Sequence, residues 1–172
     1  MFEWVLELIE RHRQLGVVVD TNVLLLYFIG RFDPEEIGRF KRTNTFVIED
    51  FRLLEWLLSQ FGQLLTTPNI LTEVSNLSGQ FSGLRRSGYF EQLRTEVSLL
   101  REEYLGSRDV VTGDAFVRFG LTDASIHLLS KGGHLVLTGE VPLYTFLQSQ
   151  GVDCINFNHL RPLAWRFFGH ER

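Results

Sequence analysis

The sequence has one cysteine, Cys154, among 172 residues, so it cannot form an internal disulfide. The lack of disulfides fits a reducing compartment. No apolar run is long enough to span a bilayer, and Glu3, Glu7 and Glu10 stand where a signal peptide has its basic start. We therefore expect a cytoplasmic protein that does not associate with a membrane.

Internal repeats, low-complexity tracts and linkers are also absent from the sequence. A chain of 172 residues with 44% hydrophobic and 22% charged residues is typical of one globular domain, which we expect to cover residues 1–172. The net charge of −4 does not favour nucleic-acid binding by the surface as a whole. Any attraction to phosphate groups must therefore be local.

The most informative stretch runs from Val17 to Asn22. Three valines in a row predict a buried strand, and the apolar residues after Asn22 predict a buried helix. Asp20 therefore lies where a strand ends and a helix begins, which is where open α/β sheets bind ligands. No Lys or Arg occurs between Arg13 and Arg31, so whatever neutralises Asp20 must come from elsewhere.

The rest of the chain alternates strand and helix patterns, which predicts an α/β fold with a mostly parallel sheet. Gly30 is expected to end the helix after Asp20, and residues 78–88, rich in glycine, are expected to form a flexible loop. The expected strands are residues 17–19, 45–48, 64–66, 134–138 and 152–157, and helices are expected over 50–62 and 90–104.

Four carboxylates occupy related places in this pattern. Asp20 and Glu140 follow predicted strand ends, and Glu73 and Asp123 lie in or near the first turns of predicted helices. Because these positions share one edge of a parallel sheet, we expect the four side chains to converge. Carboxylates without basic partners suit a hard divalent cation, Mg²⁺ or Mn²⁺.

Four ordered motifs carry a resemblance to the PIN domain family, which includes the VapC-like ribonuclease toxins. They are Val-Val-Asp20-Thr-Asn22, Thr-Pro-Asn-Ile-Leu-Thr-Glu73-Val, Leu-Thr-Asp123-Ala and Leu-Thr-Gly-Glu140. The resemblance implies a three-layer α/β/α sandwich with a mostly parallel central sheet and one acidic pocket that cuts RNA. It implies that Asp20, Glu73, Asp123 and Glu140 hold the metal, and that Asn22 and Thr138 help to hold the surrounding waters.

The chain also departs from the family pattern. Glu140 stands where the family usually has Asp. Two segments make the chain longer than a compact toxin of the family: an added N-terminal helix, residues 1–16, and a long helical insertion, residues 30–62. The resemblance still implies a Mg²⁺/Mn²⁺-dependent endoribonuclease that hydrolyses RNA phosphodiester bonds, set in a type II toxin–antitoxin pair. Its candidate partners are RNA, an antitoxin protein and a second copy of the chain.

Each site residue also has a simpler interpretation. Asp20 could only cap the following helix, Asp123 could be a first-turn acid, and Glu73 could be a surface residue. Arg85 and Arg86 either bind RNA phosphates at the mouth of the pocket or are solvated loop residues. The alternative function is therefore a degenerate PIN module that binds RNA or a protein without cleavage.

Overall fold

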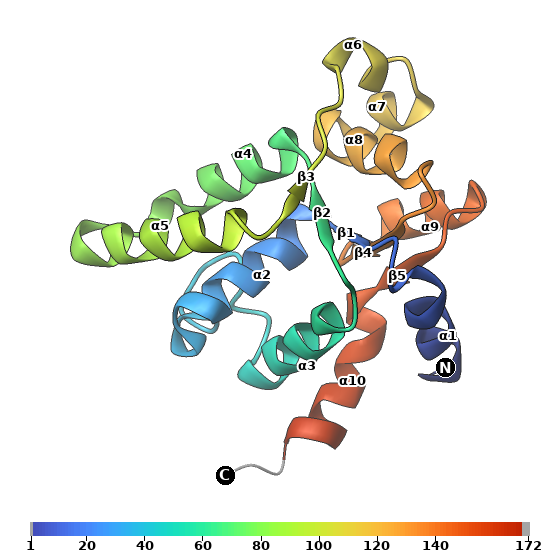
Figure 1. Ribbon diagram of the computed structural model, residues 1–172. Helices are drawn as coiled ribbons and strands as arrows, with labels where there is room; N and C mark the ends of the chain where they lie inside the picture. Colours follow the sequence, from blue (N-terminus) through green and yellow to red (C-terminus); the bar gives the residue numbers. More distant parts are fainter. Residues whose placement is uncertain (1, 170–172) are drawn as a thin grey trace.

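The computed structural model describes residues 2–169 and contains a five-stranded sheet in which every strand is parallel to its neighbours (Figure 1). The strand order is β3-β2-β1-β4-β5. The strands are β1 (Val17–Val19), β2 (Leu64–Thr66), β3 (Arg101–Glu102), β4 (Leu135–Thr138) and β5 (Cys154–Asn156). The predicted α/β class with a mostly parallel sheet is therefore confirmed.

The valine run forms the central strand. Val18 pairs with Leu65 of β2 on one side and with Val136 of β4 on the other. All three valines of β1 are fully buried, because helices cover both faces of the sheet. A continuous run of β-branched residues, without polar alternation, is what such a strand requires.

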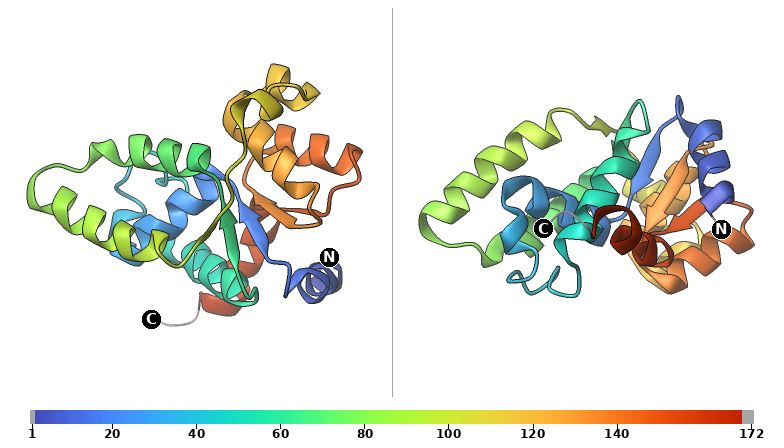
Figure 2. Two further views of the ribbon diagram at one scale, coloured as in Figure 1. Left: turned by 45° about the horizontal axis from the view of Figure 1, so that its top comes forward. Right: turned by 90° about the horizontal axis from the view of Figure 1, so that it is seen from below.

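Ten α-helices surround the sheet in the described residues. Helices α2, α3 and α10 lie on one side, and α1, α8 and α9 on the other, an arrangement compatible with a three-layer α/β/α fold (Figures 1 and 2). Their bounds are α1 (Phe2–His12), α2 (Thr21–Phe32), α3 (Ile48–Ser59), α4 (Pro68–Leu77), α5 (Gly83–Val97), α6 (Ser107–Val110), α7 (Asp114–Phe119), α8 (Leu121–Ser130), α9 (Val141–Ser149) and α10 (Phe157–Phe168).

The order of the strands places a crevice at the centre of the sheet. From β1 the chain moves outward to β2 and β3, and it then returns to the opposite side of β1 to form β4 and β5. The connections leaving β1 and β4 therefore go to opposite faces. In open parallel sheets this switch point, at the carboxyl ends of the strands, is where ligands bind.

Two expectations for residues 30–62 are wrong. Gly30 does not end α2, which continues to Phe32; a Cβ at Gly30 would lie 2.2 Å from a ring carbon of Phe51, so the glycine allows α2 and α3 to pack closely. Residues 45–48 form no strand. Helix α3 instead begins at Ile48, where the Asp50 carboxylate accepts the backbone N–H of Val47.

The prediction for residues 78–104 is also wrong. Helix α5 begins at Gly83, inside the expected loop, because Tyr89 is completely buried against Phe32 and Phe81 and its hydroxyl contacts Ser78. The helix ends at Val97 rather than Tyr104. The chain then reaches the edge of the sheet and adds β3 beside β2.

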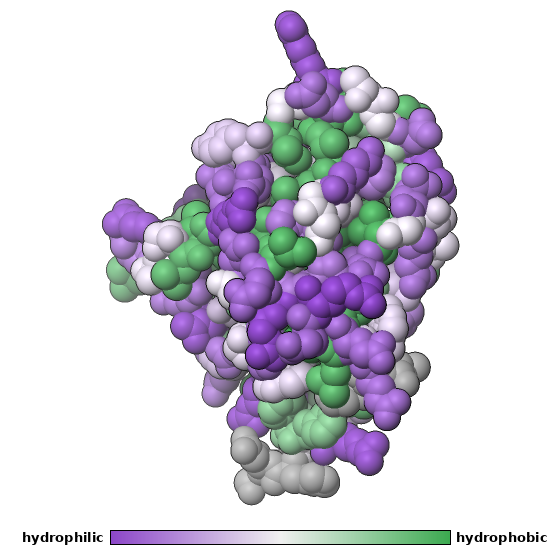
Figure 3. Space-filling view, turned by 45° about the vertical axis from the view of Figure 1, so that its right-hand side comes forward, coloured by the Kyte–Doolittle hydropathy of each residue, from purple (hydrophilic) through white to green (hydrophobic). Residues whose placement is uncertain are grey.

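None of the helices described in the structure is long and apolar enough to cross a membrane. On the face shown in Figure 3, hydrophobic side chains occur in small groups separated by hydrophilic ones.

Candidate metal centre

The four predicted carboxylates converge on one cavity of about 280 Å³. Asp20 follows β1, Glu140 follows β4, Glu73 lies on α4 and Asp123 lies in the first turn of α8. The cavity is lined by Asp20, Thr21, Asn22, Glu73, Phe119, Leu121, Thr122, Asp123 and Glu140. The sheet thus gathers side chains that are as many as 120 positions apart, counting from Asp20 to Glu140.

Asp20 is 3% exposed and is held by three hydrogen bonds. Its Oδ1 accepts the N–H of Val23 at 2.8 Å, which makes Asp20 the N-cap of α2. Its Oδ2 accepts the hydroxyl of Thr138 and, at 2.7 Å, the N–H of Gly139. An ionised carboxylate has about four lone-pair positions, so one of them, on Oδ1, stays free to bind a ligand.

Two further contacts orient the exposed glutamates. The amide of Asn22 donates to Glu140 Oε1 at 2.7 Å, and the hydroxyl of Thr21 donates to Glu73 Oε2 at 3.0 Å. Each glutamate therefore keeps one oxygen without a side-chain donor. Thr21 and Asn22 come from the first turn of α2, so the residues next to Asp20 position the carboxylates from β4 and α4.

Asp123 differs from the other three carboxylates because its side chain has no hydrogen-bond partner among the described residues. Burial, together with the negative charges of Glu140, Asp20 and Glu73, raises the pKa of Asp123 to about 7. Burial also raises the pKa of Asp20, to about 6, although its three hydrogen bonds oppose that rise. The carboxylates therefore repel one another across the cavity.

No cationic side chain compensates this charge in the described part of the chain. Neither Lys nor Arg lines the cavity, and none of the ion pairs between described residues includes any of the four carboxylates. Excess negative charge in a partly buried cavity, presented by hard oxygen atoms, fits a divalent cation such as Mg²⁺ or Mn²⁺.

The carboxylates do not form a ready-made cage. Residues 2–169 contain no group of three or more His, Cys, Asp or Glu side chains that could hold a metal ion. Mg²⁺ keeps several of its waters and usually takes only one or two protein carboxylates directly. The residues therefore fit an ion bound by a few carboxylate oxygens and by water, rather than by four carboxylates at once.

Three other predicted residues lie outside the cavity. Thr138 is fully buried, donates to Asp20 and accepts the N–H of Glu140 at 3.0 Å, so it positions carboxylates. Arg85 pairs with Asp33 and Glu36, each at 2.8 Å. The guanidinium of Arg86 lies 4.7 Å from the ring centre of Phe90. Both arginines are on α5 rather than in a loop, and neither lines the cavity.

The cavity also includes residues that the sequence interpretation did not single out. Thr21 stands between Asp20 and Asn22, so the motif itself could have indicated it. Phe119 and Leu121 form an apolar wall on either side of Gly120, whose φ of 84° turns the chain from α7 into α8. Their only signal in the sequence is this glycine between two apolar residues.

The fold and the cavity define a class: an α/β protein with a parallel sheet and an acidic site at the carboxyl ends of its central strands. No family model matches the chain, and no curated protein matches it. Among solved structures, it is similar to a domain of a functionally unknown protein from Methanocaldococcus jannaschii DSM 2661. The two chains are 17% identical, the match covers 84% of this chain and 90% of that one, and the TM-score is 0.42.

Proposed function

We propose that this protein is a Mg²⁺/Mn²⁺-dependent endoribonuclease with a PIN-like fold. One observation carries the proposal: four carboxylates line a single cavity at the switch point of the sheet, and no cationic side chain in the described residues neutralises them. The choice of RNA as substrate rests on the four ordered motifs that resemble the PIN family. The toxin–antitoxin setting rests on the same resemblance.

The chain's own side chains divide the work of holding an ion. Asp123 offers both of its oxygens, whereas Asp20 offers one position on Oδ1. Asn22 and Thr21 fix Glu140 and Glu73 at the edge of the cavity, each with one oxygen left over. A bound divalent cation supplies Lewis-acid activation of a phosphodiester and of the water that attacks it.

A module that binds RNA or a protein without cutting is the second candidate. Two observations favour it: no group of three ligands is preassembled in residues 2–169, and one oxygen of Glu140 is already taken by Asn22. In this alternative Asp20 serves only as the cap of α2. The two candidates differ in whether the cavity binds Mn²⁺.

Cleavage of single-stranded RNA in the presence of Mn²⁺ tests the proposal. We expect Asp123→Asn to lower the cleavage rate by about 10²–10³-fold, the loss seen when an electrostatic element is removed from an active site. The side chain of Asp123 has no hydrogen bond to another described residue to lose, so this variant should fold normally. Asp20→Asn should show a similar loss.

The matched control is Asp114→Asn, which changes an exposed aspartate of α7 that does not line the cavity. Its cleavage rate and Mn²⁺ affinity should equal those of the unaltered protein. Calorimetry should give Mn²⁺ binding that Asp123→Asn weakens. Cleavage undiminished in both Asp20→Asn and Asp123→Asn contradicts the proposal, and an absence of Mn²⁺ binding favours the non-cleaving module.

A further inference from the structure

A second cavity, of about 370 Å³, continues from the acidic one. Glu73, Leu121 and Thr122 line both cavities, so together they form the boundary between them. Beyond this boundary, the wall is formed by Asn69, Thr72 and Asn76 on α4. The spacing of these three residues places them along one side of the helix, over about 10 Å of its length.

The chemistry of this wall differs from that of the acidic cavity. Asn69, Thr72 and Asn76 are neutral, and their side chains make no hydrogen bond to any described residue. Neither Lys nor Arg lines this cavity in the described part of the chain. The wall therefore offers unused amide and hydroxyl groups, which can donate and accept, but no charge that could hold a phosphate.

We infer that this second cavity, called here the α4 groove, binds nucleotides of an unpaired RNA strand that lie beyond the two joined by the cleaved bond. The inference rests on the proposed function, because the acidic cavity must hold the reacting phosphate. Asparagine amides match the donor and acceptor pattern of base edges, and hydroxyls match the ribose 2′-OH. Those edges are free for such contacts in single strands, whereas duplex recognition depends on phosphate and 2′-OH contacts.

The acidic cavity alone repels a phosphate backbone, so the α4 groove has a clear energetic role. Contacts to base edges and ribose keep the strand in place without adding positive charge that would compete with a bound cation. Asn69 and Asn76 then determine which substrates bind, while the carboxylates determine whether they are cut.

The test compares KM and kcat for Asn69→Ala and Asn76→Ala on a single-stranded RNA of about ten nucleotides, a usual length for a single-strand site. Each variant should raise KM by about tenfold, the effect of one lost hydrogen bond with some loss of packing, and leave kcat and Mn²⁺ affinity unchanged. With a dinucleotide substrate, which does not reach the α4 groove, neither variant should change KM.

The control is Gln80→Ala, which removes an exposed amide three residues beyond α4 that lines neither cavity. A duplex of the same sequence should be cut much more slowly than the single strand, and the corresponding DNA strand should bind more weakly. An unchanged KM in both asparagine variants, or an equal rise with the dinucleotide, overturns the inference.

A failure of the proposed nuclease function can be distinguished from a failure of the inference about the α4 groove. If no cleavage occurs or Mn²⁺ does not bind, fluorescence anisotropy of the same labelled RNA still measures the α4 groove. Weaker RNA binding in Asn69→Ala and Asn76→Ala, but not in Gln80→Ala, then supports the inference. A lack of RNA binding, or equal binding by all three variants, overturns it.

Discussion

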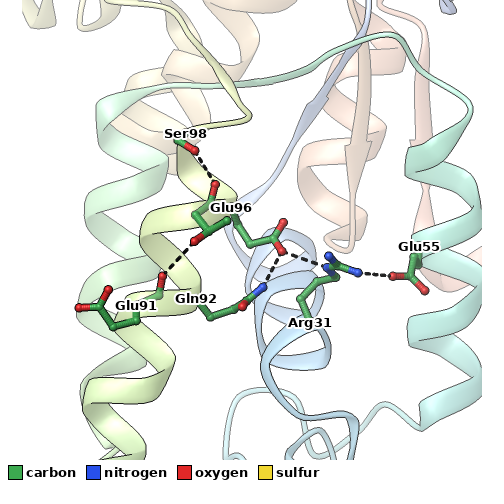
Figure 4. A network of polar contacts seen from close by, with 7 residues as sticks. Arg31, Glu55, Glu91, Gln92, Glu96 and Ser98 are labelled. Carbon is green, nitrogen blue, oxygen red and sulfur yellow. Dashed lines mark hydrogen bonds and ion pairs between the residues drawn. The ribbon is translucent and has the colours of Figure 1, made fainter.

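Glu96 and Asp123 are both carboxylates withdrawn from solvent, but only Glu96 has a cation beside it. Glu96 is 4% exposed on α5 and accepts Arg31 Nε at 3.0 Å and Gln92 Nε2 at 2.7 Å (Figure 4). Arg31 also reaches Glu55 on α3 at 3.1 Å. This network links three helices around one guanidinium, and the hydrogen bond that Arg31 donates to Glu96 raises the pKa of Arg31.

Asp50 follows the same rule as Glu96. It is 1% exposed, and Arg161 of α10 lies 2.9 Å from its Oδ2. Within residues 2–169, the buried carboxylates Glu96 and Asp50 are therefore paired with arginines, whereas those that line the cavity have no cationic partner. The paired carboxylates therefore stabilise the folded protein, whereas the unpaired negative charge of the cavity destabilises it until a cation from solution binds.

The first test of this comparison removes the positive charge of Arg31, which is paired with Glu96. Arg31→Met keeps most of the aliphatic length of the side chain but leaves the Glu96 carboxylate buried without a counter-charge. We expect the free energy of unfolding to fall by about 2 kcal/mol, less than for a fully buried ion pair, because the Arg31 side chain is partly exposed and Gln92 still donates to Glu96. Urea denaturation at neutral pH measures it.

Two controls accompany this variant. Arg94→Met removes an exposed pair on α5, with Glu91, and should cost less than about 0.5 kcal/mol. The double variant Arg31→Met/Glu96→Met should recover most of the loss, because an apolar pair has no charge to desolvate. A loss in Arg31→Met no larger than that in Arg94→Met contradicts the comparison.

The second test removes a carboxylate from the cavity. The pKa of Asp123 rises from 3.8 to about 7 on folding, so the native protein binds more protons than the unfolded chain across that range. In metal-free buffer, Asp123 therefore makes the free energy of unfolding decrease as pH rises from about 4 to 7. At pH 8, Asp123→Asn should be more stable than the unaltered protein, by roughly 2 kcal/mol.

Thermal or urea unfolding from pH 4 to pH 8, with and without Mn²⁺, measures this effect as the difference between the two proteins. The difference should vanish near pH 4, grow as pH rises and shrink again when Mn²⁺ is added at pH 8, because bound cation stabilises only the unaltered site fully. A difference that is independent of pH would mean that Asp123 is not destabilised by its surroundings.

Much of the fold was predictable because it depends on local pattern. The valine run, the glycines between elements and the alternation of strands with helices all indicated a parallel sheet, and the positions of Asp20 and Glu140 after strands indicated where the site lies. Strand β3 was not predictable, because it is only two residues long and both of its residues, Arg101 and Glu102, are polar and exposed. It forms because Leu65 and Thr66 offer an edge to pair with.

The details of the site that the sequence did not predict also depend on contacts between distant parts of the chain. Convergence of the carboxylates followed from topology, but the hydrogen bonds from Thr138 to Asp20 and from Asn22 to Glu140 each join residues 118 positions apart. No local pattern carries that information. Likewise Gly30 and Tyr89 depend on neighbours from other elements, so their roles became visible only when α2, α3 and α5 were seen packed together.

The smallest expected effect concerns Glu140, one of the two exposed carboxylates of the cavity. One of its oxygens already accepts the Asn22 amide, so Glu140 has fewer free lone pairs for a cation than Asp123 has. Glu140→Gln should therefore weaken Mn²⁺ binding by about tenfold, the cost usual for a group that supports a metal site indirectly. Calorimetric titration with Mn²⁺ measures this, with Glu55→Gln as the control that leaves the affinity unchanged. A loss as large as that in Asp123→Asn would instead make Glu140 a direct ligand.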